Sequence, residues 1–545
     1  MLRPTERLHE SHEPAAARPA ATLLLVRDAP GAIEVLMARR SARAAFAPGA
    51  HVFPGGVVDA HDHALAAAAL ASDARLASVE HLAHRAAALR ETFEEVGVLL
   101  ALDATGAAVD ARAAAALDRD EPLWPALARR GWRAALDAPR LLSRWVTDRD
   151  LPRRFDALFF VARAPDGLEP VADGTETHEP RWVRPAQALE AHARGAFELV
   201  LPTERTLRRL AGLPDVAALL ALCERAAPPP PSCARAGWVG GSVHRFTEDE
   251  PPFGELDLVA PDGRVLHRLD WQHERAVPLT RSVSRLTAPN ASMMTGPGTN
   301  AYIVGDARDC IVIDPGPADA AHAARLAALV AGRLRAIVCT HSHPDHSPGA
   351  WLLKARVEAP VLGMRSAPGV PAAWAFEPDA ALADGDRLEV AGCTLRAVHT
   401  PGHMSNHLCL VLEEDGLLFS GDHVLNGSTT VIDPVDGDMA AYLDSLARLR
   451  REPVRWVLPA HGHVLAPAHE AIDRLAAHRA GREARVLAAL RAHPGLPLSG
   501  LVAHAYADTP PRLHPVAERS LHAHLIKLER ERAAAERDAR WWPVP

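Results

Sequence analysis

Six consecutive residues in the second half of the chain carry three imidazoles and one carboxylate. They are His341-Ser342-His343-Pro344-Asp345-His346. Imidazole nitrogens and carboxylate oxygens are ligands that borderline divalent cations prefer, zinc above all. Residues 336–339, immediately before them, are a short apolar run of the kind that a buried strand shows. The sequence therefore predicts a metal site on the loop at the end of a strand, where a rigid sheet can hold it.

Three further segments place histidine or aspartate directly after a strand-like run. They are His399-Thr400-Pro401-Gly402-His403, Ser420-Gly421-Asp422-His423 and Pro459-Ala460-His461-Gly462-His463. From about residue 277 onward, strand-like runs alternate with helical ones, which is an α/β arrangement with function collected at strand ends. Unrelated histidines in a polar core are the alternative, but so many buried imidazoles would each need a hydrogen-bond partner.

Taken in order, these four segments resemble the ligand motifs of the metallo-β-lactamase superfamily. The resemblance implies a hydrolase with an αββα sandwich and two Zn²⁺ ions that share a hydroxide. It assigns His341, His343 and His403 to one zinc and Asp345, His346 and His461 to the other, with Asp422 bridging them. It also implies a catalytic role for Asp345 and a role for Asp314 in orienting a ligand imidazole. Similar ligands can also hold iron or manganese.

A second group of carboxylates lies far upstream. Residues 82–96 have apolar positions at steps of three and four, which predicts a helix. Glu91, Glu94 and Glu95 are spaced i, i+3 and i+4, so they lie on one face of that helix beside the apolar stripe. Oxygen ligands grouped in this way suit hard cations such as Mg²⁺ or Mn²⁺. A solvated helix face could show the same spacing.

The segment Arg90-Glu91-Thr92-Phe93-Glu94-Glu95-Val96-Gly97 resembles the end of the box of the Nudix hydrolases, which follows a glycine pair, here Gly55-Gly56. The resemblance implies an α/β/α sandwich in which Glu91, Glu94 and Glu95 bind Mg²⁺ or Mn²⁺. It further implies catalytic roles for Glu91 and Glu94, with Arg90 ordering them by ion pairing.

The implied Nudix substrate is a nucleotide-like or CoA-like diphosphate, because an insertion before Arg90 is similar to the coenzyme-A diphosphatase branch. Two features depart from the family pattern: Leu82 stands where a glutamate is expected eight residues before Arg90, and the interval from Gly56 to Arg90 is long. Two alternatives follow, a diphosphate hydrolase or a module that only binds such a ligand.

The C-terminal stretches 506–517 and 522–529 resemble the tail of the β-lactamase-like protein 2 branch, some of whose members are endoribonucleases acting on single-stranded RNA. This resemblance implies a winged-helix-like domain and an RNA phosphodiester substrate. Thioester hydrolysis, of an acyl-CoA or a glutathione-type thioester, is the alternative. Acidic residues are interleaved among the arginines here, so no clean phosphate-tracking stripe is present. A cap that only shapes the cleft is equally consistent with the pattern.

A proline run at 228–231 and the changes of pattern described above divide the 545 residues. We expect an α/β and α+β multidomain protein with five parts: a tail (1–17), a Nudix-like domain (18–225), a proline-rich linker and connecting segment (226–276), a metallo-β-lactamase domain (277–475) and a winged-helix-like domain (476–545). Within the connecting segment, residues 255–259 and 264–269 read as strands.

Net charge is −8 with a pI near 6.4, which gives no general attraction to nucleic acid or anionic membranes. Six cysteines without a CxxC pair predict free thiols in a reducing compartment. The start of the chain lacks the pattern of a signal peptide, and no apolar run is long enough to span a membrane. We therefore expect a cytoplasmic enzyme without a membrane partner, whose oligomeric state the sequence leaves open.

Overall fold

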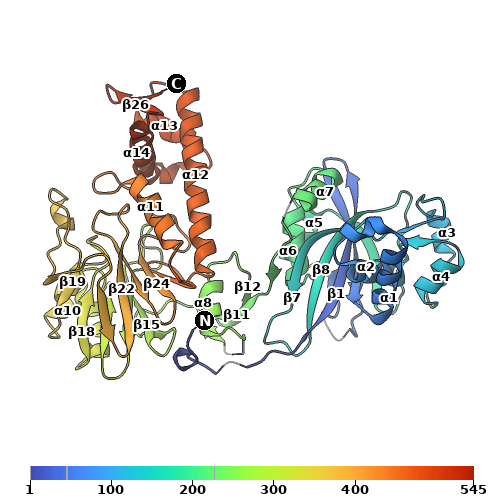
Figure 1. The fold of residues 1–545 in the computed structure, drawn as a ribbon, viewed down its shortest axis with the longest axis horizontal. Helices are drawn as coiled ribbons and strands as arrows, with labels where there is room; N and C mark the ends of the chain where they lie inside the picture. Colours follow the sequence, from blue (N-terminus) through green and yellow to red (C-terminus); the bar gives the residue numbers. More distant parts are fainter. Residues whose placement is uncertain (1, 11, 45–46, 226, 265, 545) are drawn as a thin grey trace. The chain divides into compact units, whose positions relative to one another are not determined.

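The structure, a computed structural model, describes residues 2–10, 12–44, 47–225, 227–264 and 266–544. The chain forms two compact units (Figure 1). Pro14–Ala234 is one, named here the inserted unit, and Met1–Glu13 together with Arg235–Pro545 is the other, named the sandwich unit. The Nudix-like region therefore interrupts the sandwich unit in sequence.

The inserted unit is built on one mixed sheet with strand order β10-β7-β8-β1-β2-β3, in which β4 also pairs with β1 and β9 with β2. Its strands are β1 (Ala17–Ala29), β2 (Ala32–Arg40), β3 (His51–Val52), β4 (Gly55–Val57), β7 (Arg140–Val146), β8 (Arg154–Arg163), β9 (Thr177–Val183) and β10 (Pro231–Ser232), with a separate pair β5 (Ala101–Leu102) and β6 (Arg133–Ala134). Its helices are α1 (Ala60–Ser72), α2 (Leu82–Val96), α3 (Ala111–Ala115), α4 (Leu123–Arg129), α5 (Pro185–Ala193), α6 (Leu201–Leu210) and α7 (Val216–Arg225).

Helices cover both faces of this sheet. Because successive side chains of a strand point to opposite faces, alternate residues of β1 enter different cores. Leu23 and Leu25 pack with Leu89 of α2, whereas Leu24 and Val26 pack in the cluster that contains α6 and α7. The unit is an α/β/α sandwich, and the predicted helix 82–96 is α2.

The sandwich unit contains two larger sheets. The first has order β14 (Val277–Pro278), β15 (Val283–Thr287), β16 (Asn300–Gly305), β17 (Cys310–Ile313), β18 (Leu334–Val338), β19 (Val361–Gly363) and β20 (Ala380–Ala381). The second has order β21 (Arg387–Val390), β22 (Cys393–His399), β23 (Leu408–Leu412), β24 (Leu417–Gly421) and β25 (Trp456–Pro459). Helices α9 (Ala320–Val330), α10 (Pro348–Lys354) and α11 (Met439–Leu449) follow strands of these sheets.

The two sheets face each other across one core, and helices cover their outer faces. Ile311 points into the core between the sheets, while its neighbour Val312 packs outward with Leu326 of α9. On the second sheet, Leu418 packs outward with Leu446 of α11. This layering is the predicted αββα sandwich.

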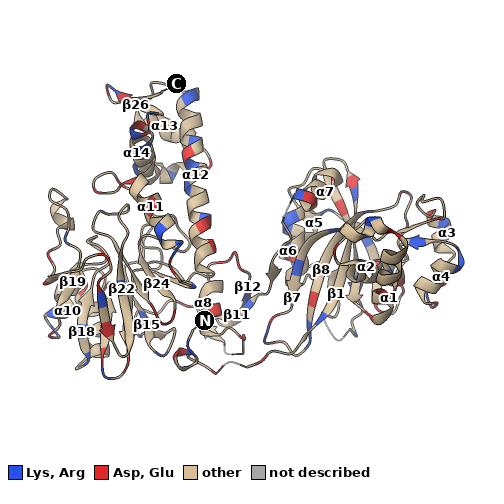
Figure 2. Ribbon diagram, in the orientation of Figure 1, with Lys and Arg blue, Asp and Glu red and all other residues tan. Residues whose placement is uncertain are grey.

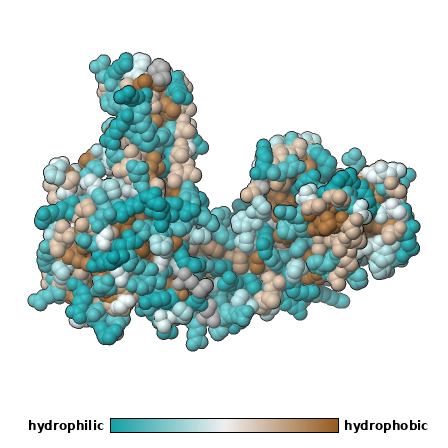
Figure 3. Space-filling model, in the orientation of Figure 1, coloured by the Kyte–Doolittle hydropathy of each residue, from teal (hydrophilic) through white to brown (hydrophobic). Residues whose placement is uncertain are grey.

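The C-terminal part is built from α12 (Ala468–Ala492), α13 (Leu498–Ala505), α14 (His514–Arg530) and the hairpin of β26 (Ala534–Arg537) and β27 (Arg540–Pro543), which is the predicted winged-helix-like arrangement of helices and a hairpin. Helix α12 is continuous across the expected boundary between residues 475 and 476. Cationic and anionic residues are interleaved along α12 (Figure 2), and hydrophilic residues cover much of the visible surface (Figure 3). In the part of the chain that the structure describes, every helix is too short or too polar to cross a membrane.

Two expected segments have a different structure. Residues 255–259 form the end of helix α8 (Phe253–Val259) and not a strand. Of 264–269, residue 265 lies outside the described residues, and the described ones include the two-residue strand β13 (His267–Arg268), which joins β11 (Arg235–Val239) and β12 (Ser242–Phe246) in a third sheet. The expected solvated tail also differs, because Leu2 is buried in the core between the sheets and Arg3 makes an ion pair with the buried Asp415.

Candidate functional site

Four loops carry the predicted metal ligands, and each loop follows a strand of the sandwich. His341 lies three residues after β18, His403 four residues after β22 and His461 two residues after β25, while Asp422 directly follows β24. Strands β18 and β25 belong to different sheets, so the site is assembled where the ends of the two sheets meet. The strand-end position predicted for the six-residue motif is therefore found.

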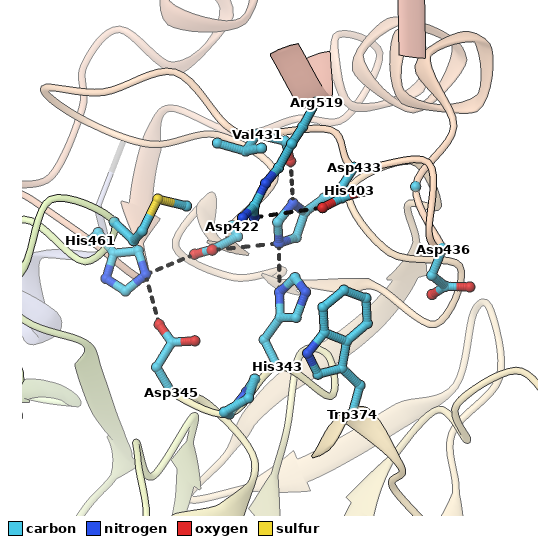
Figure 4. A pocket seen from close by; sticks show the side chains of 13 residues that line it. His343, Asp345, Trp374, His403, Asp422, Val431, Asp433, Asp436, His461 and Arg519 are labelled. Carbon is cyan, nitrogen blue, oxygen red and sulfur yellow. Dashed lines mark hydrogen bonds and ion pairs between the residues drawn. The ribbon is translucent and has the colours of Figure 1, made fainter. Parts of the chain in front are cut away.

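The structure brings the seven predicted ligands into two neighbouring groups. Within each group, one ligand atom per residue lies within 4.8 Å of the others: His341, His343, His403 and Asp422 form the first, and Asp345, His346 and His461 form the second. Asp422 Oδ1 lies 3.2 Å from His461 Nε2 and 3.5 Å from His346 Nε2, so its carboxylate stands between the groups (Figure 4).

Hydrogen bonds outside the cluster fix how three of the imidazoles face it. His403 Nδ1 donates to the carbonyl of Val431 at 2.7 Å, and His461 Nδ1 donates to the carbonyl of Gly298 at 3.2 Å. Since a carbonyl only accepts, each neutral ring carries its proton on Nδ1 and turns the lone pair of Nε2 toward the cluster. His346 Nδ1 lies 3.1 Å from Asp314 Oδ2 and is oriented in the same way.

In the resulting arrangement, imidazole nitrogens and carboxylate oxygens of the ligands face one another at short distance. His461 Nε2 is 3.3 Å from Asp345 Oδ2, and because an ionised carboxylate cannot donate, the position between them takes either a cation or a proton carried by the imidazole. His346 Nε2 and Asp422 Oδ1 are buried and find no hydrogen-bond partner among the described residues. Converging lone pairs in a buried site need a cation or protons between them, so this set of nitrogen and oxygen donors fits a divalent metal.

The pKa values differ between the two groups in a way that follows from charge. Burial lowers the pKa of His343 to about 3, and the neighbouring His403 adds to this effect. Burial also disfavours charge on His461, but Asp422 and Asp345 outweigh it and raise the pKa of His461 to about 9. Although burial opposes it, His461 and His346 hold the pKa of Asp422 well below its usual range. The second group is therefore the more strongly charged one.

The pocket above these ligands has an apolar wall and a charged rim. Met294, Trp374 and Val431 line it together with the ligands, and the ring of Trp374 packs edge-on against His343 with centroids 4.9 Å apart. Arg519 of α14 projects into it from the winged-helix domain and lies 3.5 Å from Asp433 (Figure 4). Sequence reasoning did not identify these lining residues, because their loops carry no metal-binding pattern.

The upstream carboxylates are arranged around Arg90 on α2. Arg90 Nη1 donates to Glu91 Oε1 and to Glu94 Oε2, both at 2.9 Å. Glu95 lies apart and accepts a longer bond of 3.4 Å from the backbone N–H of Gly55. Burial, with Glu94 adding to it, raises the pKa of Glu91 to about 7 against the effect of Arg90, and burial raises that of Glu95 well above its usual value.

Among the described residues, the histidine site has groups of three or more side chains whose metal-binding atoms lie within 4.8 Å of one another. The carboxylates of Glu91, Glu94 and Glu95 do not form such a group. Arg90 Nη1 binds both Glu91 and Glu94, while Glu95 lies apart against the backbone of Gly55. Their predicted role as Mg²⁺ or Mn²⁺ ligands stays a prediction.

A residue missed by the sequence reasoning completes this cluster. Asp62, fully buried in α1, pairs with Arg90 through both carboxylate oxygens at 2.9 and 3.1 Å. It reaches Arg90 from 28 residues upstream in the sequence. A side chain on Gly55 would collide with the backbone of Ala21 and Thr22, so this glycine is required by close packing, while one on Gly56 would displace the Glu91 carboxylate. The six-residue step from Gly56 to Asp62 was the available signal.

Comparisons with known proteins cover both units. Residues 294–461 match the family model described as Metallo-beta-lactamase superfamily, and residues 498–541 match that described as Beta-lactamase associated winged helix domain. The chain is 31% identical over 273 residues to a Beta-lactamase-like protein 2 homolog of Drosophila melanogaster, covering 46% of this chain and 89% of that protein.

The chain is also similar to a thioesterase in sequence and to a Nudix hydrolase of known structure. An Atrochrysone carboxyl ACP thioesterase of Aspergillus chevalieri is 34% identical over 235 residues, which are 41% of this chain and 72% of that protein. A NUDIX hydrolase of known structure from Alicyclobacillus acidocaldarius matches at 31% identity and a TM-score of 0.33, covering 38% of this chain and 96% of that one. The resemblances to the metallo-β-lactamase superfamily and to a winged helix are thus each met by a match.

Proposed function

Because the chain belongs to the metallo-beta-lactamase superfamily of hydrolases, we propose that its pocket binds two divalent cations, zinc by expectation, and hydrolyses a phosphopantetheine thioester such as an acyl-CoA or an acyl carrier protein adduct. The observation that carries the metal site is the pair of ligand groups on either side of Asp422. Bound cations would supply a nucleophilic water at neutral pH and stabilise the oxyanion that forms on attack at the thioester carbonyl.

The chain's own residues would orient and hold the reactants. The carbonyls of Val431 and Gly298 keep His403 and His461 turned toward the site. Asp345 Oδ2 accepts from Thr299 Oγ1 at 3.4 Å, and His346 and His461 hold the pKa of Asp345 below its usual range although burial opposes this, so it would stay ionised and accept a hydrogen bond that orients the attacking water. The apolar wall with Trp374 and Met294 would contact the acyl group and exclude water from it.

Two observations favour a thioester over RNA. Relatives of this part of the chain include proteins named as ACP thioesterases, at 32–34% identity. The rim of the pocket also holds the carboxylates of Asp436 and of Asp433, the latter 3.5 Å from Arg519, whereas single-stranded nucleic acid is held by grooves rich in cations. Hydrolysis of single-stranded RNA, implied by the β-lactamase-like protein 2 resemblance, is the alternative.

Purified full-length protein loaded with zinc separates these two substrates. We expect acyl-CoA to release free thiol, detected with a thiol-reactive dye, and we expect His343→Ala to abolish this release because His343 belongs to the first ligand group. Single-stranded RNA is incubated in parallel, and metal content is measured on the same sample. RNA cleavage that depends on His343, without thiol release, would replace the thioester proposal by the alternative.

The inserted unit has a second candidate function, Mg²⁺- or Mn²⁺-dependent hydrolysis of a nucleotide-like or CoA-like diphosphate. The specific observation is the cluster in which Arg90 contacts Asp62, Glu91 and Glu94. We expect Mg²⁺-dependent cleavage of CoA or a nucleotide diphosphate that Glu94→Gln abolishes. The exposed Glu190, paired with Arg194, provides the control Glu190→Gln. A wild-type protein that binds these compounds without cleaving them would establish a binding module in place of a hydrolase.

We expect both reactions to take place in the cytoplasm. The six cysteines show no CxxC pair and no small-scaffold spacing in the sequence, which is the pattern of proteins from a reducing compartment.

A further inference from the structure

Glu255 is a fully buried carboxylate that lies outside the part of the chain matching the superfamily. It belongs to α8, and both of its oxygens are occupied by cationic or ring donors. Arg285 Nη1 and Nη2 donate to it at 2.5 and 3.0 Å, and His267 Nε2 lies at 2.9 Å. Its remaining partner is His463, whose Nδ1 lies 3.1 Å from Oε2.

His463 connects this buried cluster to the metal centre, because it follows the ligand His461 by two residues. Its other side is also fixed: the ring of Trp271 stacks on it with centroids 4.4 Å apart and an interplanar angle of 26°. Arg285 in turn lies over Trp271, 4.7 Å from the ring centroid. His463 therefore has little freedom to move, and neither does the backbone that it shares with His461.

The same connecting segment contacts the backbone of this loop directly. A side chain on Gly254 would collide with the backbone of residues 464–466, so α8 packs on the loop as closely as its backbone allows. Asn426 Nδ2 donates at 2.9 Å both to the carbonyl of Pro251 and to that of His463. On the opposite side, Asn300 Nδ2 donates to the carbonyl of Gly462 at 2.9 Å.

We propose that Glu255 is a positioning residue, which holds the His461 loop through His463 so that the ligand group of Asp345, His346 and His461 can close on its cation. The inference rests on the proposed metal site. Apart from its contacts within the cluster, the His461 side chain has one hydrogen bond, of 3.2 Å, to the carbonyl of Gly298. Its position therefore depends on the position of the backbone of its own loop. Metal coordination tolerates only small displacements of a ligand, which makes such support effective.

The variant Glu255→Gln tests this with the metal alone. Glutamine keeps the shape of the side chain but presents an N–H₂ group to donors, which breaks the contact with Arg285 or with His463. Full-length wild-type and variant proteins are stripped of metal and titrated with Zn²⁺ against a chelator. We expect wild type to bind two equivalents, and the variant to bind the first unchanged and the second at least about tenfold more weakly. Thermal unfolding of the metal-free proteins shows whether the variant is folded.

A matched control and a second variant complete the test. Glu274→Gln makes the same substitution in the same segment at an exposed residue paired with Arg325, and we expect it to bind both equivalents as wild type does. His463→Ala removes the connecting ring but leaves the pair of Glu255 and Arg285, so it should fold and also weaken only the second equivalent.

Three outcomes would contradict the inference. Unchanged binding of both equivalents by His463→Ala would overturn it, and so would an equal loss of both equivalents in a folded variant. Wild-type protein that binds fewer than two equivalents would overturn the proposed function, and the inference with it.

Discussion

The carboxylate of Asp314 tests the metal centre sharply, because each of its contacts has a fixed donor. The backbone N–H of Thr340 donates to Oδ1 at 2.8 Å, while Oδ2 receives the Thr340 hydroxyl at 2.7 Å and His346 Nδ1 at 3.1 Å. In Asp314→Asn, one oxygen becomes an N–H₂ group. If the N–H₂ group takes the position of Oδ1, it faces the backbone N–H of Thr340, a donor that cannot rotate away. If it takes the position of Oδ2, it faces the N–H of His346.

His346 can escape the second clash only by moving its proton to Nε2. That nitrogen then points a proton at the cation position, and the ligand is lost from the group of Asp345, His346 and His461. Loss of such an outer partner typically costs about 10–100-fold in metal affinity, or about 1.4–2.7 kcal/mol. We expect Asp314→Asn to weaken Zn²⁺ binding by this factor in a chelator competition at constant pH.

Asp319→Asn provides the control for this prediction. Asp319 caps the start of α9 and accepts from the backbone N–H groups of Ala321 and His322, so it lies close in sequence but outside the cluster. It should alter stability slightly and leave Zn²⁺ affinity unchanged. Equal affinities for wild type and Asp314→Asn would show that Asp314 does not set the orientation of His346, and the tautomer argument would be wrong.

Three further predictions concern other parts of the chain. Arg3→Met leaves the buried Asp415 without its ion-pair partner and should lower the free energy of unfolding by about 1–2 kcal/mol in urea, with Arg7→Met as the control. Burial raises the pKa of Glu91 from 4.5 to about 7, so the folded state binds that proton more tightly than the unfolded state does, and in metal-free protein this one group contributes a loss of stability as pH rises from 4.5 through 7. Glu91→Gln should remove about 1–3 kcal/mol of this pH dependence, and an unchanged slope in calorimetry would contradict it. Gly402→Ala, at φ +139° and against the backbone of Tyr442, should displace the His403 loop and lower both the melting temperature and Zn²⁺ affinity; a fully metal-loaded variant would show that the loop adapts.

The six-residue motif could be placed from sequence because its information is local, whereas its division into two groups with His403, Asp422 and His461 was implied by the family resemblance. A short apolar run places His341 at a strand end, and the spacing of the motif places its neighbours around it. The groups that orient the ligands could not be predicted in the same way. Val431 and Gly298 act through backbone carbonyls, which every residue has, so nothing in their side chains marks them.

Segments whose structure depends on distant contacts were predicted least well. Alternation of Leu256 and Leu258 with charged residues imitates a strand, but a three-residue step joins Phe253, Leu256 and Val259, and the helix packs on residues 464–466. Asp62 was overlooked for a similar reason, since its partner Arg90 lies 28 residues away. Arg3 and Asp415 are separated by 412 residues, and no local pattern predicts their pairing.

The interruption of the sandwich unit by residues 14–234 has a consequence for the order of folding during synthesis. The inserted unit can close once β10 has emerged, whereas Leu2 and Arg3 wait for partners that include Asp415. Its sheet then holds its two connections near each other: β10 and β1 are separated only by β7 and β8, which at 4.8 Å per strand is about 14 Å. Once the inserted unit has folded, residues 14–234 connect the two parts of the sandwich unit as a short, stiff link and no longer as a long flexible loop. This lowers the entropic cost of docking the first residues of the chain.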